Sequence, residues 1–258
     1  MTFATRDGLD VYYQSHGEGP ALVLIHGSGG NHASWWQQLP QLRASHRVIT
    51  LDLPGFGASP AGPERWDMDG YVRDVVAVLD DASVQRAVLV GQALGGALAA
   101  RLAVEHPQRV AGVVLAHSTG AIDDAQLVQM LREDRAQAEQ LPVAERLMGA
   151  EFAAASPELV FLFMQLGTFN RARLADIRNA GEPGPTGHEL ATSGVPVCFL
   201  TGADDAVIRP ATVSRAQQLV AGSTLELVAG APHAMYWAAP GRFNDAVARF
   251  LNTVHHWA

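Results

Sequence analysis

The chain has 258 residues, of which 48% are apolar, and its formal net charge is −8. That apolar fraction is too high for a disordered chain, and the acidic balance argues against a protein that binds nucleic acid through a basic groove. The length suits one α/β domain, with or without a modest insertion.

Cysteine content and hydropathy suggest the compartment. Cys198 is the single cysteine, so neither a disulfide framework nor a cysteine-based metal cluster can form within the chain. The first ten residues carry Arg6, Asp7 and Asp10 and no apolar run, which is unlike a signal peptide. Apolar stretches elsewhere end well short of the roughly 18 residues of a membrane span. We expect a cytoplasmic protein that makes no membrane contact.

The N-terminal part reads as a hairpin followed by buried strands. Asp7-Gly8 separates two β-like runs, at residues 3–6 and 9–15, and predicts a hairpin turn. Two continuous apolar runs, residues 21–25 and 47–51, predict strands that are buried on both faces.

Helices and further strands then alternate along the chain. Apolar residues at helical spacing predict helices over residues 34–42, 67–82, 94–106, 210–220 and 241–254. Short apolar runs predict strands over residues 87–90, 110–116, 195–201 and 223–228. Such alternation predicts an α/β fold, a mostly parallel central sheet with helices on both faces.

One segment breaks this alternation. Residues 119–194 separate two predicted strands and look mostly helical, so we interpret them as a helical cap inserted into a core of residues 1–118 and 195–258. The aromatic residues of this segment, Phe161, Phe163 and Phe169, are expected to pack in its core rather than to line a substrate cavity.

Four loops carry the residues suited to chemistry, and each follows a predicted strand. They are His26-Gly27, the Gly-rich turn at residues 91–96, residues 202–207 and residues 230–233. Together the four loops resemble those of the α/β-hydrolase family, and the resemblance covers nearly the whole chain. It implies an α/β-hydrolase fold in which residues 91–96 form the nucleophile elbow, a strained turn between a strand and a helix.

The resemblance also implies a catalytic triad in the order nucleophile, acid, histidine. His233 matches the histidine, which serves as general base and then general acid. Asp204 and Asp205 both stand where the acid belongs, and the family pattern Gly-x-x-Asp selects Asp205. The nucleophile position is Ala93, which has no hydroxyl and cannot attack a carbonyl.

The loop of residues 26–30 is rich in glycine but lacks the Gly-Lys-Ser/Thr ending of a phosphate-binding loop. By resemblance it is the oxyanion loop. It would supply one backbone N–H donor at Ser28, and the second would come from Leu94, directly after the nucleophile position. The substrate-binding residues expected beside it are Gly27, Gly29 and Trp36. No group of His, Cys, Asp and Glu shows metal-ligand spacing, so we expect neither metal nor cofactor.

Ala93 leaves three hypotheses open. In the first, the chain is an inactive variant of a serine hydrolase that cleaves a carboxylic ester, lactone or similar carbonyl bond of a small, partly apolar molecule. In the second, it is a natural enzyme without a nucleophile, such as a lyase, isomerase, cyclase or cofactor-free oxygenase, with His233 and Asp205 as its base. In the third, it is a pseudo-hydrolase that only binds a small ligand. The sequence leaves the oligomeric state open.

Overall fold

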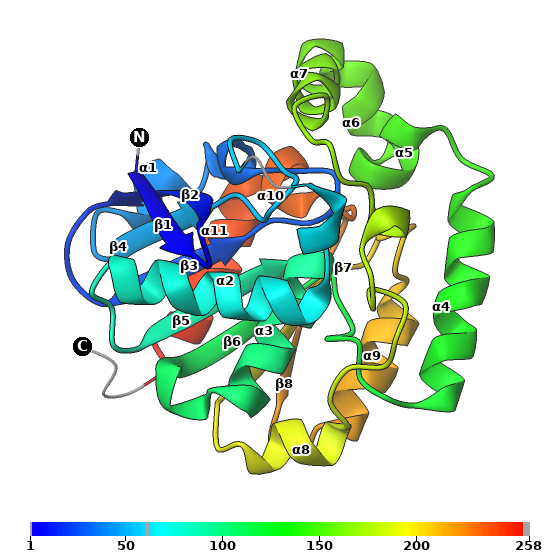
Figure 1. Cartoon of the computed structure of the whole chain (residues 1–258). Helices are drawn as coiled ribbons and strands as arrows, with labels where there is room; N and C mark the ends of the chain where they lie inside the picture. Colours follow the sequence, from blue (N-terminus) through cyan, green and yellow to red (C-terminus); the bar gives the residue numbers. More distant parts are fainter. Residues whose placement is uncertain (1, 60–61, 255–258) are drawn as a thin grey trace.

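The computed structural model describes residues 2–59 and 62–254, and within them an eight-stranded sheet forms the centre (Figure 1). Its order is β1-β2-β4-β3-β5-β6-β7-β8. The strands are β1 (Thr2–Arg6), β2 (Leu9–His16), β3 (Ala21–Ile25), β4 (Arg47–Leu51), β5 (Ala87–Gln92), β6 (Val110–Ala116), β7 (Val197–Gly202) and β8 (Thr224–Val228). β2 is antiparallel to β1 and β4, and all other neighbours are parallel. The predicted mostly parallel sheet is confirmed.

The hairpin between β1 and β2 turns at the predicted dipeptide. Asp7 and Gly8 have φ angles of 51° and 77°, and Arg6 pairs with Leu9 across the turn. A two-residue turn with positive φ at both positions matches the right-handed twist of the strands that it joins.

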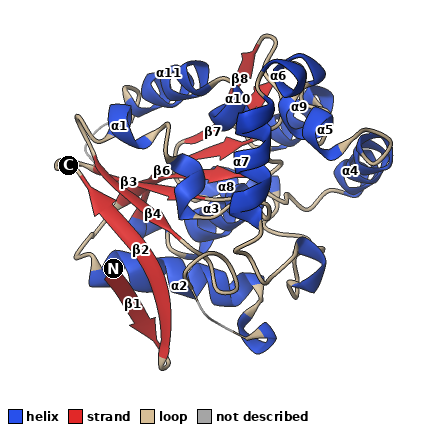
Figure 2. Cartoon of the chain, turned by 90° about the horizontal axis from the view of Figure 1, so that it is seen from above, coloured by secondary structure: helices blue, strands red, loops and turns tan. Residues whose placement is uncertain are grey.

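Helices cover both faces of the sheet, as Figure 2 shows from above. On one face lie α2 (Met68–Asp81), α3 (Leu94–Glu105), α8 (Gly187–Thr192) and α9 (Pro210–Leu219). On the other lie α1 (Leu39–Leu42), α10 (Met235–Ala238) and α11 (Pro240–Leu251). Because the central strands β3, β5 and β6 are covered on both faces, all their residues are buried. Three-residue 3-10 turns at η2 (Pro63–Arg65), η3 (Pro107–Arg109) and η4 (Leu174–Asp176) complete the connections.

The predicted helix over residues 34–42 is wrong. The chain forms a 3-10 turn, η1 (His32–Trp35), and then the single helical turn α1. Pro40 lies at the start of α1, where its missing N–H and its ring prevent the helix from continuing backwards. The separation lets Trp35 turn into the core, where it is 1% exposed.

The segment between β6 and β7 forms helices, as its composition predicts. They are α4 (Ala125–Ala138), α5 (Val143–Met148), α6 (Ala150–Ala155) and α7 (Pro157–Gly167), followed by α8. In Figure 1, α5, α6 and α7 lie together at one end of the sheet, while α4 runs beside α9. No described helix is long and apolar enough to cross a membrane.

The expectation for the aromatic residues of this segment holds in part. Phe163 is 6% exposed and packs edge-on against Trp237. Phe161 and Phe169 are 65% and 66% exposed, so the expectation that they pack in a core is wrong. Phe163 faces α10, which contains Trp237, whereas Phe161, two residues away on α7, faces solvent.

The strand order also determines where loops meet. From β3 the chain passes to β4 on one side, and β5 pairs with β3 on the other. In an open α/β sheet, the carboxyl ends of two such strands border a crevice where ligands bind. The loops after β3 and β5 therefore lie side by side, with the loops after β6, β7 and β8 following along the same edge.

Candidate active site

The turn after β5 has the strained geometry of an elbow. Ala93 joins β5 to α3 with φ 49° and ψ −105°, a conformation that costs an alanine on the order of 1–3 kcal/mol. Its N–H donates to Ala116 O at 2.9 Å, and the Ser118 hydroxyl donates to Ala93 O at 2.8 Å. Hydrogen bonds with β6 and with the loop that follows it therefore hold the strained turn in place.

Two glycines of this turn are required by the close approach of α3 to the sheet. A Cβ at Gly91 would lie 2.1 Å from Gly95 O, and a Cβ at Gly95 would lie 2.2 Å from Ile25 O. Both obstacles are backbone atoms, which cannot move away as a side chain can. The elbow is therefore built for close contact between helix and sheet whatever side chain occupies position 93.

Asp205 and His233 meet beside the elbow. The Nδ1–H of His233 faces both carboxylate oxygens of Asp205 at 3.0 Å, and both residues are buried. The same carboxylate accepts the backbone N–H groups of Val207 and Ile208 at 2.8 and 2.9 Å. Asp204, by contrast, is exposed, so the geometry favours Asp205 as the partner of His233.

Gln92 adds a contact that sequence reasoning missed. Because Nδ1 of His233 carries its proton toward Asp205, Nε2 is an acceptor, and the Gln92 amide donates to it at 3.2 Å. The Gln92 side chain also lies against the loop after β3, since a Cβ at Gly27 would be 2.0 Å from Gln92 Oε1. A side chain at position 27 would therefore require the Gln92 amide to move. The only sequence signal for this contact is that Gln92 directly precedes position 93.

His117 is the second site residue that sequence reasoning missed. It follows β6 directly, is fully buried, and its Nδ1–H donates to Asp205 Oδ2 at 2.8 Å. Its sequence signal is only its place immediately after a predicted strand.

The electrostatics of this cluster follow from burial and shared hydrogen bonds. Burial alone would raise the pKa of the Asp205 carboxyl, but attraction to His233 and hydrogen bonds from His117 and His233 hold that pKa well below its usual range. Burial lowers the pKa of the His117 imidazole, and the Asp205 carboxylate only partly opposes this effect. The structure thus holds an ionised carboxylate between two imidazoles.

His117, Asp205 and His233 are also the one group in the described part of the chain whose ligand atoms lie close enough to hold a metal, within 4.8 Å of one another. However, the Nδ1 atoms of both histidines already contact carboxylate oxygens at hydrogen-bond distance, 2.8–3.0 Å. Protons shared with Asp205 account for this spacing, so the geometry favours a hydrogen-bonded cluster and no metal site is assigned.

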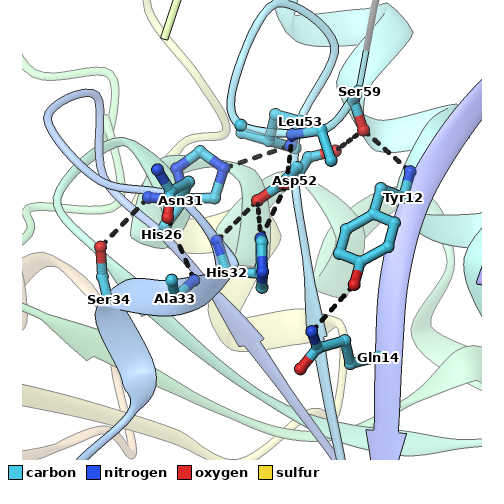
Figure 3. A network of polar contacts seen from close by, with 12 residues as sticks. Tyr12, Gln14, His26, Asn31, His32, Ala33, Ser34, Asp52, Leu53 and Ser59 are labelled. Atoms are coloured by element: carbon cyan, nitrogen blue, oxygen red, sulfur yellow. Dashed lines mark hydrogen bonds and ion pairs between the residues drawn. The ribbon is translucent and has the colours of Figure 1, made fainter. Parts of the chain in front are cut away.

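The residues that directly follow β4 hold the loop after β3, as Figure 3 shows. Asp52 accepts the backbone N–H of His32 at 2.6 Å, its ring Nδ1–H at 2.8 Å, and the N–H of Ala58 at 2.7 Å. His26 Nε2 accepts the N–H of Leu53 at 3.1 Å. These contacts fix both ends of the segment that contains Ser28.

The expected oxyanion donors lie on this loop and on the elbow. Leu94 is the first residue of α3, so its N–H has no partner within the helix. Within the described residues, the Ser28 N–H also donates to no protein group. Gly29 is exposed, and Trp36, 47% exposed, packs edge-on against Trp237.

The helical segment contacts both loops of the site. Asn31 Nδ2 donates to Leu166 O at 3.0 Å, and Asn170 Nδ2 donates to Gly30 O at 3.0 Å, which joins α7 and the residues after it to the loop after β3. On the other side, the N–H of Ala234, next to His233, donates to Leu147 O of α5 at 2.6 Å. The segment is therefore attached to the site on two sides.

We expect acid to destabilise the fold between pH 7.5 and 5.5. Burial lowers the pKa of His26 and of His117, so both stay neutral when folded but take up a proton near pH 6.5 when unfolded. The unfolded state then binds more protons, so between pH 7.5 and 5.5 the free energy of unfolding falls by about 1.4 kcal/mol for each imidazole that stays neutral in the folded state.

Urea unfolding at pH 7.5 and 5.5 measures this loss. The variant His117→Asn should lose part of the pH dependence, because His26 and His46, whose pKa values burial also lowers, supply the rest. Replacing the exposed His188 by Asn should leave it unchanged. Equal midpoints at the two pH values in the unmodified protein would contradict the prediction.

Comparison with known proteins identifies the class to which this fold and site belong. A family model for the alpha/beta hydrolase fold matches residues 20–240. The chain belongs to the α/β-hydrolase family, as its sequence resemblance predicted.

Relatives with assigned activities cover most of the chain. It is 30% identical over 252 residues to 3-oxoadipate enol-lactonase 2 from Acinetobacter baylyi, which covers 94% of this chain and 93% of the relative. It is 28% identical over 269 residues to pimeloyl-(acyl-carrier protein) methyl ester esterase from Aeromonas hydrophila subsp. hydrophila, covering 94% of this chain and 100% of the relative. A solved thermophilic esterase from Thermogutta terrifontis shares the fold, with a TM-score of 0.82 at 22% identity, covering 99% and 98% of the two chains. A methyl ester esterase and an enol-lactonase are thus among its relatives.

Proposed function

We propose that this site is built to hydrolyse a carboxylic ester, a lactone or a similar carbonyl bond of a small, partly apolar molecule. The observation that carries the proposal is the direct hydrogen bond between buried His233 and Asp205 beside a strained elbow at Ala93. Charged and strained groups of this kind cost stability, and catalysis is the function that such an arrangement serves.

The proposed chemistry is an acyl transfer in two steps. With a serine at position 93, the hydroxyl would attack the carbonyl carbon while Nε2 of His233 takes its proton, and Asp205 would hold the imidazole in position. The N–H groups of Ser28 and Leu94 would stabilise the oxyanion. His233 would then protonate the leaving alcohol, and water activated by the same imidazole would release the acid.

Ala93 blocks this route in the chain as it stands. Its methyl group cannot form an acyl-enzyme, so we propose that the protein is an inactive or strongly impaired form of a serine hydrolase. The rest of the proposed machinery does not depend on the side chain at position 93. Removal of the nucleophile typically costs about 10⁶ in rate and leaves the fold intact.

A second candidate is an enzyme that needs no nucleophile. The observation that favours it is that buried His233 and Asp205 keep the geometry of a base although position 93 carries no hydroxyl. In such an enzyme, His233 would remove a proton from the substrate itself, and the same N–H donors would hold the resulting enolate. The third hypothesis, a protein that only binds its ligand, has no contact in its favour beyond Ala93.

We propose that exposed Gly29 and Trp36 contact the substrate, with the helical segment of residues 119–194 as the cap that selects it. Gly27, packed against Gln92, would contribute backbone only. Burial raises the pKa of the Cys198 thiol to about 11, so this buried cysteine stays protonated and unreactive. A single free thiol suits a reducing compartment, and we propose the cytoplasm.

The first test is covalent labelling. Incubated with a fluorophosphonate, the Ala93→Ser variant should gain the mass of one adduct, and the unmodified protein should gain none. The adduct forms only when base, elbow and oxyanion donors act together, which is why intact mass spectrometry is a direct measurement of the assembled site.

The outcomes separate the three hypotheses. A folded Ala93→Ser variant that is never labelled would overturn the serine-hydrolase proposal. Turnover by the unmodified protein that disappears in His233→Ala would favour the enzyme without a nucleophile. Ligand affinity that does not change in His233→Ala, with no turnover in any variant, would favour the binding protein.

A further inference from the structure

His117 combines three features that do not stabilise a fold. Its φ angle is 50°, in the left-handed region that residues other than glycine rarely adopt. It is 0% exposed, and burial lowers its pKa, so a neutral imidazole is enclosed in the core. Its Nε2 atom has no hydrogen-bond partner among the described residues. Unfavourable features that coincide at one residue point to a function at that residue.

The partner of His117 is the carboxylate that orients His233. Oδ1 of Asp205 accepts the N–H groups of Val207 and Ile208, whereas Oδ2 accepts Nδ1–H of His117 at 2.8 Å. His233 lies between the two oxygens, 3.0 Å from each. Without His117, no donor other than His233 would hold Oδ2, and only the hydrogen bonds to Oδ1 would resist rotation of the carboxylate plane about its bond to Cβ.

The two imidazoles also contact each other. Their rings lie edge to face, with centroids 5.5 Å apart, so the position of His117 limits the tilt of the His233 ring. Burial lowers the pKa of His117, so the imidazole that donates through Nδ1 to Asp205 is neutral and adds no positive charge next to His233.

We propose that His117 is a positioning residue for His233 that acts through Asp205. It fixes the carboxylate so that His233 keeps its proton on Nδ1 and presents Nε2 as an acceptor toward the elbow. The inference rests on the proposed function only for the reaction in which His233 would act as base. The hydrogen bonds that orient His233 are already present with Ala93 in place.

Two kinds of substitution separate positioning from packing. Asparagine carries a side-chain N–H at the same number of bonds from the backbone as Nδ1 of histidine, and it tolerates positive φ. His117→Asn therefore keeps the donor to Oδ2. His117→Leu and His117→Ala remove this donor. The Ala variant is used if the protein with Leu at this position does not fold.

The primary measurement is made on the protein with Ala93. Nitrogen-15 NMR of labelled histidine reports which ring nitrogen of His233 is protonated, with the signals assigned by their loss in His233→Gln. We expect protonated Nδ1 and unprotonated Nε2 in the unmodified protein and in His117→Asn. In His117→Leu and His117→Ala, the hydrogen-bonded Nδ1–H signal should move upfield and the two nitrogen signals should approach each other. Unchanged His233 signals in a folded Leu or Ala variant would overturn the positioning role.

A second measurement links this geometry to reactivity. In the Ala93→Ser background, fluorophosphonate labelling should slow by about tenfold or more in His117→Leu or His117→Ala, a part of the 10²- to 10⁴-fold that a general base contributes, and should stay within about threefold in His117→Asn. Equal slowing in all variants would contradict the role of the donor. If Ala93→Ser is not labelled at all, the proposed function fails, and the NMR measurement still decides the role of His117.

Discussion

In the Ala93→Ser background, the substitution His233→Ala is expected to lower kcat for a small ester by about 10⁶-fold, to the level of the unmodified protein. In the proposed mechanism, His233 takes the proton from the nucleophile and returns it to the leaving group, and no other group in the site is assigned to either step. Residues that act as a unit do not contribute additively, so loss of the base alone should cost almost as much as loss of the nucleophile. Initial rates with a chromogenic short-chain ester measure the effect.

The matched control is His188→Ala in the same background. His188 is exposed on α8, which packs beside α3 and α9, and its replacement should leave kcat unchanged. A double variant Ala93→Ser, His233→Ala with more than about a hundredth of the Ala93→Ser rate would show that another group acts as the base. Gln92 cannot be that group, because an amide does not accept a proton at neutral pH.

The substitution Gly91→Ala is expected to destabilise the fold by about 3 kcal/mol or more, or to prevent folding. Its Cβ would lie 2.1 Å from Gly95 O, and α3 cannot retreat as a simple rigid body because it packs on β5 and β6 and has α2 and α8 beside it. For a chain of this size, such a loss lowers Tm by about 10 °C. Thermal unfolding followed by circular dichroism measures the change.

Gly241→Ala provides the contrast within the same chain. Gly241 lies in the first turn of α11, and a Cβ there would meet no heavy atom within 4 Å. Alanine favours the helix over glycine by up to about 1 kcal/mol, so Tm should stay equal or rise. A Gly91→Ala variant that unfolds within about 2 °C of the unmodified protein would show that the elbow adapts more easily than its contacts indicate.

The sheet was predictable because its strands carry their signal in the residue types themselves. An unbroken apolar run such as that of β3 fits only a strand covered on both faces, and Asp7-Gly8 fits a turn with two positive φ angles. The predicted fold class is confirmed, and so is the family. The predicted helix over residues 34–42 fails because one residue, Pro40, outweighs the periodicity around it.

The site was predictable only where residues carry a motif. Asp205 and His233 follow strands in a characteristic order, and the structure brings them to hydrogen-bond distance. Gln92 and His117 contact the same cluster, yet each is a single polar residue at a strand end without a spacing pattern. Their partners lie far along the chain, 141 and 88 residues away, and only the sheet order brings them together. Exposure of Phe161 and burial of Phe163 were likewise decided by how α7 is seated.

The attachment of the helical segment to both site loops constrains how this protein can change its specificity. Leu166 O receives the side chain of Asn31, Asn170 reaches Gly30, and Leu147 O receives the N–H next to His233. A segment transplanted from another member of the family would need acceptors and an amide at the same three places, or the loops of Ser28 and His233 would lose their supports. Under the proposed function, a change of this segment would therefore alter specificity and reactivity together, so the segment would not be an interchangeable module.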